Sequence, residues 1–362
     1  MQDDAPEPTL IYAVPAALLL GAYLVGQTMG LALNGPVLLS SALFCVFAIG
    51  GLSSQKTANF GNKMGLLGVS GGLLVTTMTA GTSLALKQQM GIVMAAGAAL
   101  GAAVASKAGV TDLPQLVAGF HSLVGVAAVA TALSSQMAEV AHHSALVAAA
   151  VGKTAAAKAA AATLAASSGG HMIHSVTTFL AAIIGAVTLT GSAVAFAKLQ
   201  GLVSGKPLAL PFKRIINAAL ALATIFSMKL FLAGAATAAS MPALYAGTAI
   251  AGVLGFLVTA GVGGGDMPVV ITLLNSASGW ALCAEGLVLS NNLLLVVGAL
   301  IGSSGAVLSQ IMCVAMNKGI VATLGLLTPP PKPLAPRDPN APVVEQRYFV
   351  TQLSMDSFMC ET

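Results

Sequence analysis

The chain has 362 residues, of which 57% are hydrophobic and only 7% are charged, whereas ordinary soluble domains carry about 25% charged residues. This composition predicts an integral membrane protein. With 40 glycines and 5% aromatic residues, it favours a tight bundle of transmembrane helices, because small residues let helix backbones approach closely. The formal net charge of +4 comes from 15 basic and 11 acidic residues spread along the chain, which provides no basic face for nucleic acid.

The predicted elements are about ten membrane-spanning helices, each formed by roughly 17 to 25 mostly apolar residues. An acidic, proline-bearing extramembrane segment, residues 1–9, precedes them. In chain order the spans cover 10–30, 36–52, 64–81, 90–106, 115–134, 174–197, 214–236, 242–262, 267–289 and 293–317. The predicted fold class is therefore all-α, a polytopic transmembrane helix bundle over residues 10–319.

Two segments depart from this pattern. Residues 135–173 are rich in alanine and contain lysines, which favours helix without the apolar bulk of a span. We therefore expect a long connection formed by a surface helix. Adjacent His142 and His143 would point in different directions there, which disfavours a metal site. Prolines in residues 320–362 predict an extended extramembrane tail, which is either disordered or a docking peptide.

Basic residues between the spans are distributed unevenly. An even number of spans places both termini on one side of the membrane. That side has Lys56, Lys63, Lys107, Lys198, Lys206, Lys213, Arg214 and Lys318; the other has Lys87, Lys153 and Lys158, with Lys229 near its boundary. The excess of basic residues on the terminal side predicts that both termini face the mitochondrial matrix or, in a bacterium, the cytoplasm.

No metal-binding or nucleotide-binding motif is found. Cys45, Cys283 and Cys313 lie in apolar runs and Cys360 lies in the tail, without CxxC spacing, so neither a zinc site nor a disulfide framework is indicated. The run GVGGGD at 261–266 lacks the GxGxxG spacing and a preceding strand that a dinucleotide-binding loop requires. We therefore expect no cofactor to bind this chain.

Polar side chains within the spans are the candidates for chemistry, because they are costly in a bilayer. His121 stands in the run PQLVAGFHSLVGV, which has no other ionisable group. An imidazole has an unperturbed pKa of about 6.5, so it can exchange protons near neutral pH. His121 is therefore either a proton relay or a histidine whose nitrogens are satisfied across a helix interface.

Three further polar residues are candidates for a functional role. Ser192 follows two threonines within two turns; such hydroxyls hold a file of water or, more often, bond their own backbone. Asp266 is expected at a membrane boundary where a helix starts, because an acid there favours the helix dipole. Asn275 then falls about 13 Å further along that helix, where its buried amide serves either a proton path or helix packing.

Four long strings together resemble the membrane domain of proton-translocating NAD(P) transhydrogenase. They are DLPQLVAGFHSLVG (112–125), GAVTLTGSAVAFAKLQG (185–201), GGGDMPVVITLLNSASGWALCAEG (263–286) and VGALIGSSGAVLSQIMCVAMNK (297–318). The likeness runs in collinear order from about residue 5 to residue 320. The segment DDAPEPTLIYAVPAALLLGAYL is more similar to the mitochondrial form. The resemblance implies that His121, Ser192 and Asn275 form the proton path, and that Asp266 and Lys318 pass the proton signal to a nucleotide domain.

Several features depart from the family. About 40 residues follow the last predicted span, too few for a doubly wound NADP(H)-binding domain. Ala277 stands where the family usually has tyrosine, and Lys318 stands where arginine is usual. The stretch 135–170 also differs from the compact loop of the family.

The resemblance leaves two functions open. In the first, the chain is the proton-translocating membrane subunit of a split NAD(P) transhydrogenase, in which other polypeptides bind NAD and NADP and carry out hydride transfer. In the second, it is a catalytically inactive structural subunit of a larger respiratory or energy-transducing complex. The expected location is the mitochondrial inner membrane, or alternatively a bacterial plasma membrane. The family also implies a homodimer in the lipid bilayer.

Overall fold

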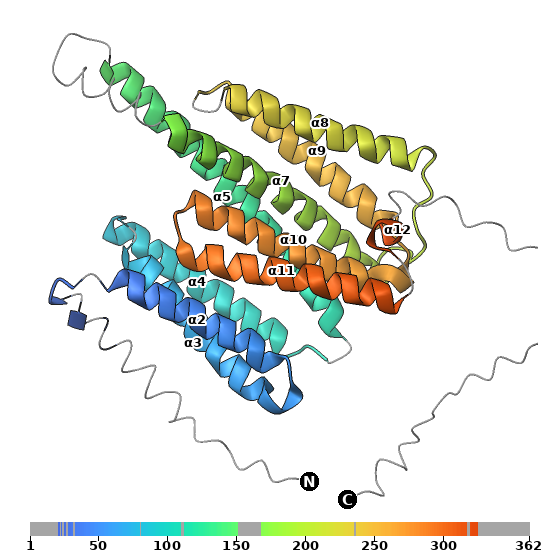
Figure 1. Cartoon of the computed structure of the whole chain (residues 1–362), viewed down its shortest axis with the longest axis horizontal. Helices are drawn as coiled ribbons and strands as arrows, with labels where there is room; N and C mark the ends of the chain where they lie inside the picture. Colours follow the sequence, from blue (N-terminus) through green and yellow to red (C-terminus); the bar gives the residue numbers. More distant parts are fainter. Residues whose placement is uncertain are drawn as a thin grey trace, which may run out of the picture.

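The computed structural model describes residues 21, 23, 25–26, 28–31, 33–79, 81–109, 112–150, 168–234, 237–316 and 319–324. Within these ranges every regular element is a helix (Figure 1). Eight helices are long and apolar enough to cross a membrane, which confirms the all-α polytopic prediction. The segment 1–9, most of the first predicted span, Lys318 and the tail from 325 onward lie outside the described residues.

The long helices follow the predicted spans in chain order. They are α2 (Asn34–Leu52), α3 (Ala58–Thr79), α4 (Leu84–Ala105), α5 (Leu113–Ala150), α7 (Ser168–Leu199), α8 (Lys213–Ala233), α9 (Ser240–Ala260), α10 (Met267–Val288) and α11 (Asn292–Ala315). Short turns of helix join or follow them: η1 (Gln55–Thr57), η3 (Gly264–Asp266) and α12 (Ile320–Thr323).

Helix α5 is much longer than the predicted span at 115–134. Its 38 residues cover about 57 Å at 1.5 Å per residue, whereas the hydrocarbon core of a bilayer is about 30 Å thick. The polar residues after 134 end the apolar run, but no glycine or proline interrupts 126–150, and alanine is the best helix former. The first part of the predicted 135–173 connection is therefore a continuation of the span itself.

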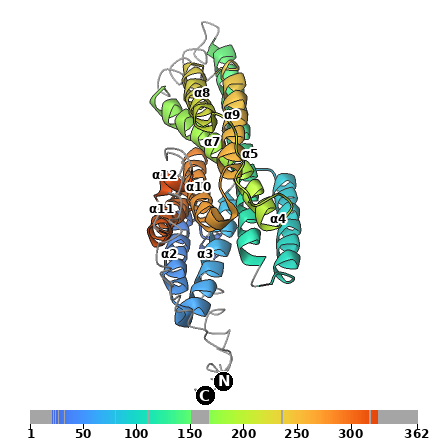
Figure 2. The same cartoon turned by 90° about the vertical axis from the view of Figure 1, so that its right-hand side faces the viewer.

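Three helices form the centre of the bundle. Helix α7 packs against α5, α9 and α10, and α10 also packs against α5 and α11. The paired helices α2 and α3 lie on one side, and α8 with α9 lies on the other (Figure 1). Helix α4 has no buried residue and stands at the edge of the bundle (Figure 2). The residues of the predicted proton path are thus on these three helices, of which α10 and α7 are the most buried spans among the described residues.

Glycines allow α7 to approach its two neighbours closely. A methyl group at Gly125 of α5 would lie 2.5 Å from the backbone nitrogen of Leu189 in α7, and one at Gly255 of α9 would lie 2.5 Å from the carbonyl oxygen of Val187. Ordinary contacts between such atoms are about 3.5 Å or longer. Only glycine is therefore compatible with these two backbone contacts, as is usual where membrane helices pack closely.

Successive long helices alternate in direction. The end of α7, the start of α8, the end of α9 and the start of α10 gather at one end of the bundle, on the right in Figure 1. We call this the Asp266 end, because Asp266 precedes α10 there. Lys198 and Lys213, at the ends of α7 and α8, lie at the same end, in agreement with the predicted alternation of the connecting segments.

Candidate functional site

The centre of the candidate site is a direct contact between α5 and α10. The Nε2 atom of His121 lies 2.9 Å from Oδ1 of Asn275, although 154 positions separate the two residues. An amide oxygen can only accept a hydrogen bond, so Nε2 carries the hydrogen and donates it. In a neutral imidazole the other nitrogen is then the acceptor. His121 is 9% exposed, and its Nδ1 is buried without a hydrogen-bond partner among the described residues.

The residues next to this pair bond α5 and α10 to two other helices. Ser122 donates its hydroxyl hydrogen to the carbonyl oxygen of Leu189 in α7, at 2.8 Å. Ser276 donates in the same way to the carbonyl oxygen of Gly302 in α11, at 2.6 Å. Hydrogen bonds between membrane helices are individually worth about 0.6 kcal/mol. They fix orientation more than they add stability, and here they orient His121 and Asn275 toward each other.

Ser192 differs from the two threonines that precede it. Thr188 donates to its own helix at Ile184, and Thr190 donates to the carbonyl oxygen of Gly252 in α9, so both serve helix structure and packing. Ser192 is fully buried on α7, and its Oγ has no hydrogen-bond partner among the described residues. Its hydroxyl is therefore uncommitted, in a helix that packs on both α5 and α10.

Asp266 stands where the sequence predicted it, immediately before the first residue of α10. Its side chain makes no capping hydrogen bond to that helix, but a negative charge at this position still interacts favourably with the helix dipole. Asn275 lies nine residues further along the same helix, or about 13 Å. Helix α10 therefore joins the Asp266 end of the bundle to the buried pair. Lys318, the other predicted coupling residue, lies outside the described residues.

Two lysines at the Asp266 end have a role that the sequence did not indicate. The Lys198 ammonium group, in a side chain 9% exposed, donates to the carbonyl oxygens of Ala260 at 2.7 Å and Val262 at 2.6 Å. Lys213 donates to the carbonyl oxygen of Gly261 at 3.1 Å. These carbonyls follow the last turn of α9, where helix carbonyls lack intrahelical donors. Both lysines therefore hold the end of α9 against α7 and α8.

One acidic side chain inside a span also went unpredicted. Glu285 lies on α10, three residues before its end, and is only 5% exposed. The sequence signal that marks it is a single carboxylic acid in an otherwise apolar run, which is rare in membrane helices. Its burial and its contacts come from the fold.

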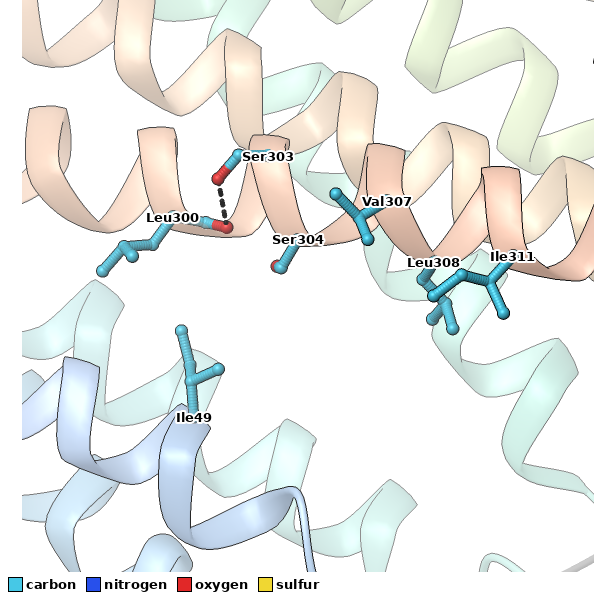
Figure 3. Close-up of a pocket in the computed structure, with 7 residues that line it drawn as sticks. All are labelled: Ile49, Leu300, Ser303, Ser304, Val307, Leu308 and Ile311. Atoms are coloured by element: carbon cyan, nitrogen blue, oxygen red, sulfur yellow. Dashed lines mark hydrogen bonds between the residues drawn. The ribbon is translucent and has the colours of Figure 1, made fainter.

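A hollow of about 440 Å³ lies between α2 and α11 (Figure 3). Its lining consists of Ile49, Leu300, Ser303, Ser304, Val307, Leu308 and Ile311. None of these side chains is titratable, and Ser303 donates to the carbonyl oxygens of Ala299 and Leu300 in its own helix. This apolar groove is consequently suited to contact with lipid or another helix and does not provide a route for protons.

The part of the chain that the structure describes contains no group of three or more His, Cys, Asp or Glu side chains placed to hold a metal ion. Cys45 and Cys313 are buried, Cys283 is partly buried, and all three are unpaired. The imidazole of His121 can exchange a proton, and the side chains of Asn275 and Ser192 offer hydrogen-bonding groups.

Comparison with known proteins shows which family the chain matches. Residues 35–328 match the family described as NAD(P) transhydrogenase beta subunit. Two relatives from Rhodospirillum rubrum, each named NAD(P) transhydrogenase subunit beta, are 38% identical to this chain over 275 residues. The aligned part covers 76% of this chain and 54% of each relative, so the chain spans about half the length of the curated relatives it matches.

Proposed function

This chain belongs to the family of NAD(P) transhydrogenase beta subunits, and from that premise we propose that it conducts protons through the membrane for a transhydrogenase. In this function other polypeptides bind NAD(H) and NADP(H) and transfer the hydride. The membrane chain couples that transfer to proton movement. The observation that supports this proposal most directly is the hydrogen bond between His121 and Asn275 in the centre of the bundle.

His121 acts as the proton relay through its Nδ1 atom. In the neutral ring, Nε2–H donates to Asn275 Oδ1, and Nδ1 has a lone pair that accepts a proton. The resulting imidazolium still donates from Nε2 to Asn275, so the ring keeps its orientation in both charge states. Release of the Nδ1 proton restores the neutral tautomer. Ser192 supplies a hydroxyl that accepts a hydrogen bond from the group carrying the proton, or donates one to the group receiving it, directly or through water.

Helix α10 links the relay to the nucleotide domains. A change of charge at His121 alters its interaction with Asn275, and Asp266 lies about 13 Å away on the same helix. We assign Asp266 and Lys318 to coupling, as the family resemblance implies. Lys198 and Lys213 support this arrangement because they fix the end of α9 beside the start of α10.

The proposed location is the mitochondrial inner membrane, with both termini and the Asp266 end facing the matrix and the chain working as a homodimer. The excess of basic residues in the segments at that end supports the orientation. A purely structural role in a respiratory complex is less favourable, because it offers no compensation for retaining a buried imidazole whose Nδ1 has no partner among the described residues.

The relay is tested by His121→Ala in vesicles of the native membrane that contain the assembled complex. Proton uptake and hydride exchange between NADPH and an NAD analogue are measured in parallel. Loss of the imidazole should abolish the coupled proton uptake. The matched control is Ser303→Ala in the apolar groove, which should leave uptake unchanged. Thermal unfolding establishes that both variants are folded. Wild-type proton uptake by folded His121→Ala would refute the proposal.

A further inference from the structure

Asp266, Asn275 and Glu285 lie at three different depths along α10. Asn275 and Glu285 lie on α10, and Asp266 immediately precedes its first residue. Asp266 to Glu285 is 19 residues, about 28 Å along the helix, close to the roughly 30 Å thickness of the hydrocarbon core. Asn275 lies between them, about 15 Å from Glu285. Glu285 is therefore near the membrane face opposite the Asp266 end, and His121 lies between the two acids.

The buried carboxyl group of Glu285 contacts α5, the helix that holds His121. The Thr131 side chain lies beside it, next to the buried cluster in which Ala284 of α10 packs with Ala132 of α5. Thr131 is ten residues after His121 on α5, and Glu285 is ten residues after Asn275 on α10, so two corresponding contacts join the same pair of helices about 15 Å apart. A carboxylic acid at this depth is costly in a bilayer and marks a functional position by default.

Thr131 also begins a row of polar residues on α5. Ser135, Glu139 and His143 follow it at four-residue spacing, so the four side chains lie on one face of the helix. We call these four residues the α5 polar row. Because α5 is about 57 Å long, the outer part of the row extends to or beyond the membrane boundary, where water is available.

Helix α7 supplies partners to the outer part of the α5 polar row. His174 Nε2 lies 3.3 Å from the hydroxyl oxygen of Ser135. His171 pairs through Nδ1 with a carboxylate oxygen of Glu139, and its ring lies edge-on to the ring of His143, with centroids 6.4 Å apart. Imidazole and carboxylate groups can pass protons to and from water. Protonatable groups therefore continue from the outer end of α5 to Glu285.

We propose that Glu285 is the proton-uptake acid of this subunit, which receives protons along the α5 polar row and passes them to His121. The proposal rests on the proposed function. The protonated carboxyl group gives up one proton and becomes a carboxylate, and Nδ1 of His121 accepts that proton. The carboxylate then takes a proton from the outer face by way of the Ser135–His174 and Glu139–His171 pairs. Each transfer is reversible and moves one proton.

The distance of about 15 Å between Glu285 and the relay requires intervening hydroxyl groups or water. Thr178 of α7 is fully buried, and its Oγ1 has no hydrogen-bond partner among the described residues. It lies one turn before Ala182, which packs in one buried cluster with Ala132 of α5 and Ala284 of α10. A buried hydroxyl of this kind usually bonds an ordered water. Thr178 is also one turn after His174 on α7, so it lies on the outer side of Glu285 and is placed to hold a water between the α5 polar row and Glu285. The transfer from Glu285 to His121 then proceeds through further water molecules.

The experiment uses the assembled complex in liposomes, with variants Glu285→Gln and Thr131→Val. The glutamine variant keeps the size of the side chain but cannot exchange a proton, so proton uptake should fall by at least about tenfold. Thr131→Val keeps the carboxyl group and removes the hydroxyl beside it, so a smaller loss is expected. Thr248→Val is the matched control, because Thr248 bonds only its own helix in α9, at Leu244.

A second readout does not depend on activity. Infrared spectra recorded while the outer pH is changed should contain a carboxyl C=O band that is missing in Glu285→Gln and shifted in Thr131→Val. A purely structural Glu285 gives no band that responds to the outer pH. If Glu285→Gln does not assemble, the test rests on Thr131→Val. Wild-type proton uptake by Thr131→Val, together with an unshifted carboxyl band, overturns the proposal.

The outcomes separate this proposal from the proposed function. Wild-type uptake by Glu285→Gln, while His121→Ala is inactive, overturns the role of Glu285 and leaves the relay in place. Wild-type uptake by both variants overturns both. Reduced uptake in Glu285→Gln with loss of the carboxyl band, and with Thr248→Val unchanged, supports proton delivery through Glu285.

Discussion

The close contact of α5 with α7 predicts that Gly125→Ala will damage both stability and proton conduction. The added methyl carbon would lie 2.5 Å from the Leu189 nitrogen, 2.6 Å from the Gly185 carbonyl oxygen and 2.8 Å from the Leu189 Cα. All three atoms belong to the backbone, so no side-chain rotation relieves the overlap. Restoring ordinary contact distances of about 3.5 Å requires α5 to move away from α7 by roughly 1 Å.

This displacement has two measurable consequences. Overpacking of a tight interior generally costs about 1–3 kcal/mol, so the free energy of unfolding in detergent should fall by that amount. His121 lies one turn before Gly125, and a shift of about 1 Å would stretch its 2.9 Å bond to Asn275 beyond the range of a hydrogen bond. Misplacement of a reacting group by about 1 Å can lower a rate by roughly 100-fold.

The matched control is Gly101→Ala on α4, where a methyl group would meet nothing within 4 Å. This variant should unfold like wild type or be more stable by up to about 1 kcal/mol, because alanine favours helix over glycine. Unfolding is followed by circular dichroism in a denaturing-detergent titration, and proton uptake is followed in liposomes. If Gly125→Ala matches Gly101→Ala in both measurements, the close packing of α5 on α7 does not position the relay.

Two further substitutions test hydrogen bonds that hold the helices around the site in place. Lys198→Met should lower the free energy of unfolding by about 1–3 kcal/mol, because buried carbonyl groups lose their donor. Hydrogen exchange in residues 259–263 should become faster, and unchanged exchange would contradict the contact. Ser122→Ala removes one interhelical hydrogen bond, to Leu189, and should cost only about 0.6 kcal/mol in the same unfolding titration. A loss above about 2 kcal/mol would mean that Ser122 does more than orient α5.

The sequence predicted the helical class and the order of the spans because long apolar runs report membrane crossing directly. The far end of α5 was wrong for a physical reason. Hydropathy falls at Ser134, Ser135 and Gln136, but a helix continues wherever its backbone propensity is favourable, and the alanines after 137 provide that. Ser135, Glu139 and His143 were therefore assigned to a surface connection, although they extend the helix that carries His121.

The candidate site was only partly accessible from sequence. His121 and Asn275 were each recognisable as costly polar residues in apolar spans, but no periodicity places residues 154 positions apart in contact; only the family resemblance joined them. Glu285 is three residues from the end of its helix, where an acid is usually solvated at the membrane boundary. It is buried because other helices pack on α10 at this position, among them α5, whose Ala132 lies in one cluster with Ala284. Contacts between helices distant in sequence decided this part of the site.

The most direct test of the account is to isolate the intact complex from its native membrane in mild detergent, identify the polypeptides that accompany the chain, and return it to liposomes. Hydride exchange between NADPH and an NAD analogue is then measured with and without an uncoupler. We predict that nucleotide-binding polypeptides accompany the chain, and that hydride exchange drives proton movement which His121→Ala abolishes. Co-purification with a respiratory complex that shows no hydride exchange would contradict the account and identify the bundle as a structural subunit.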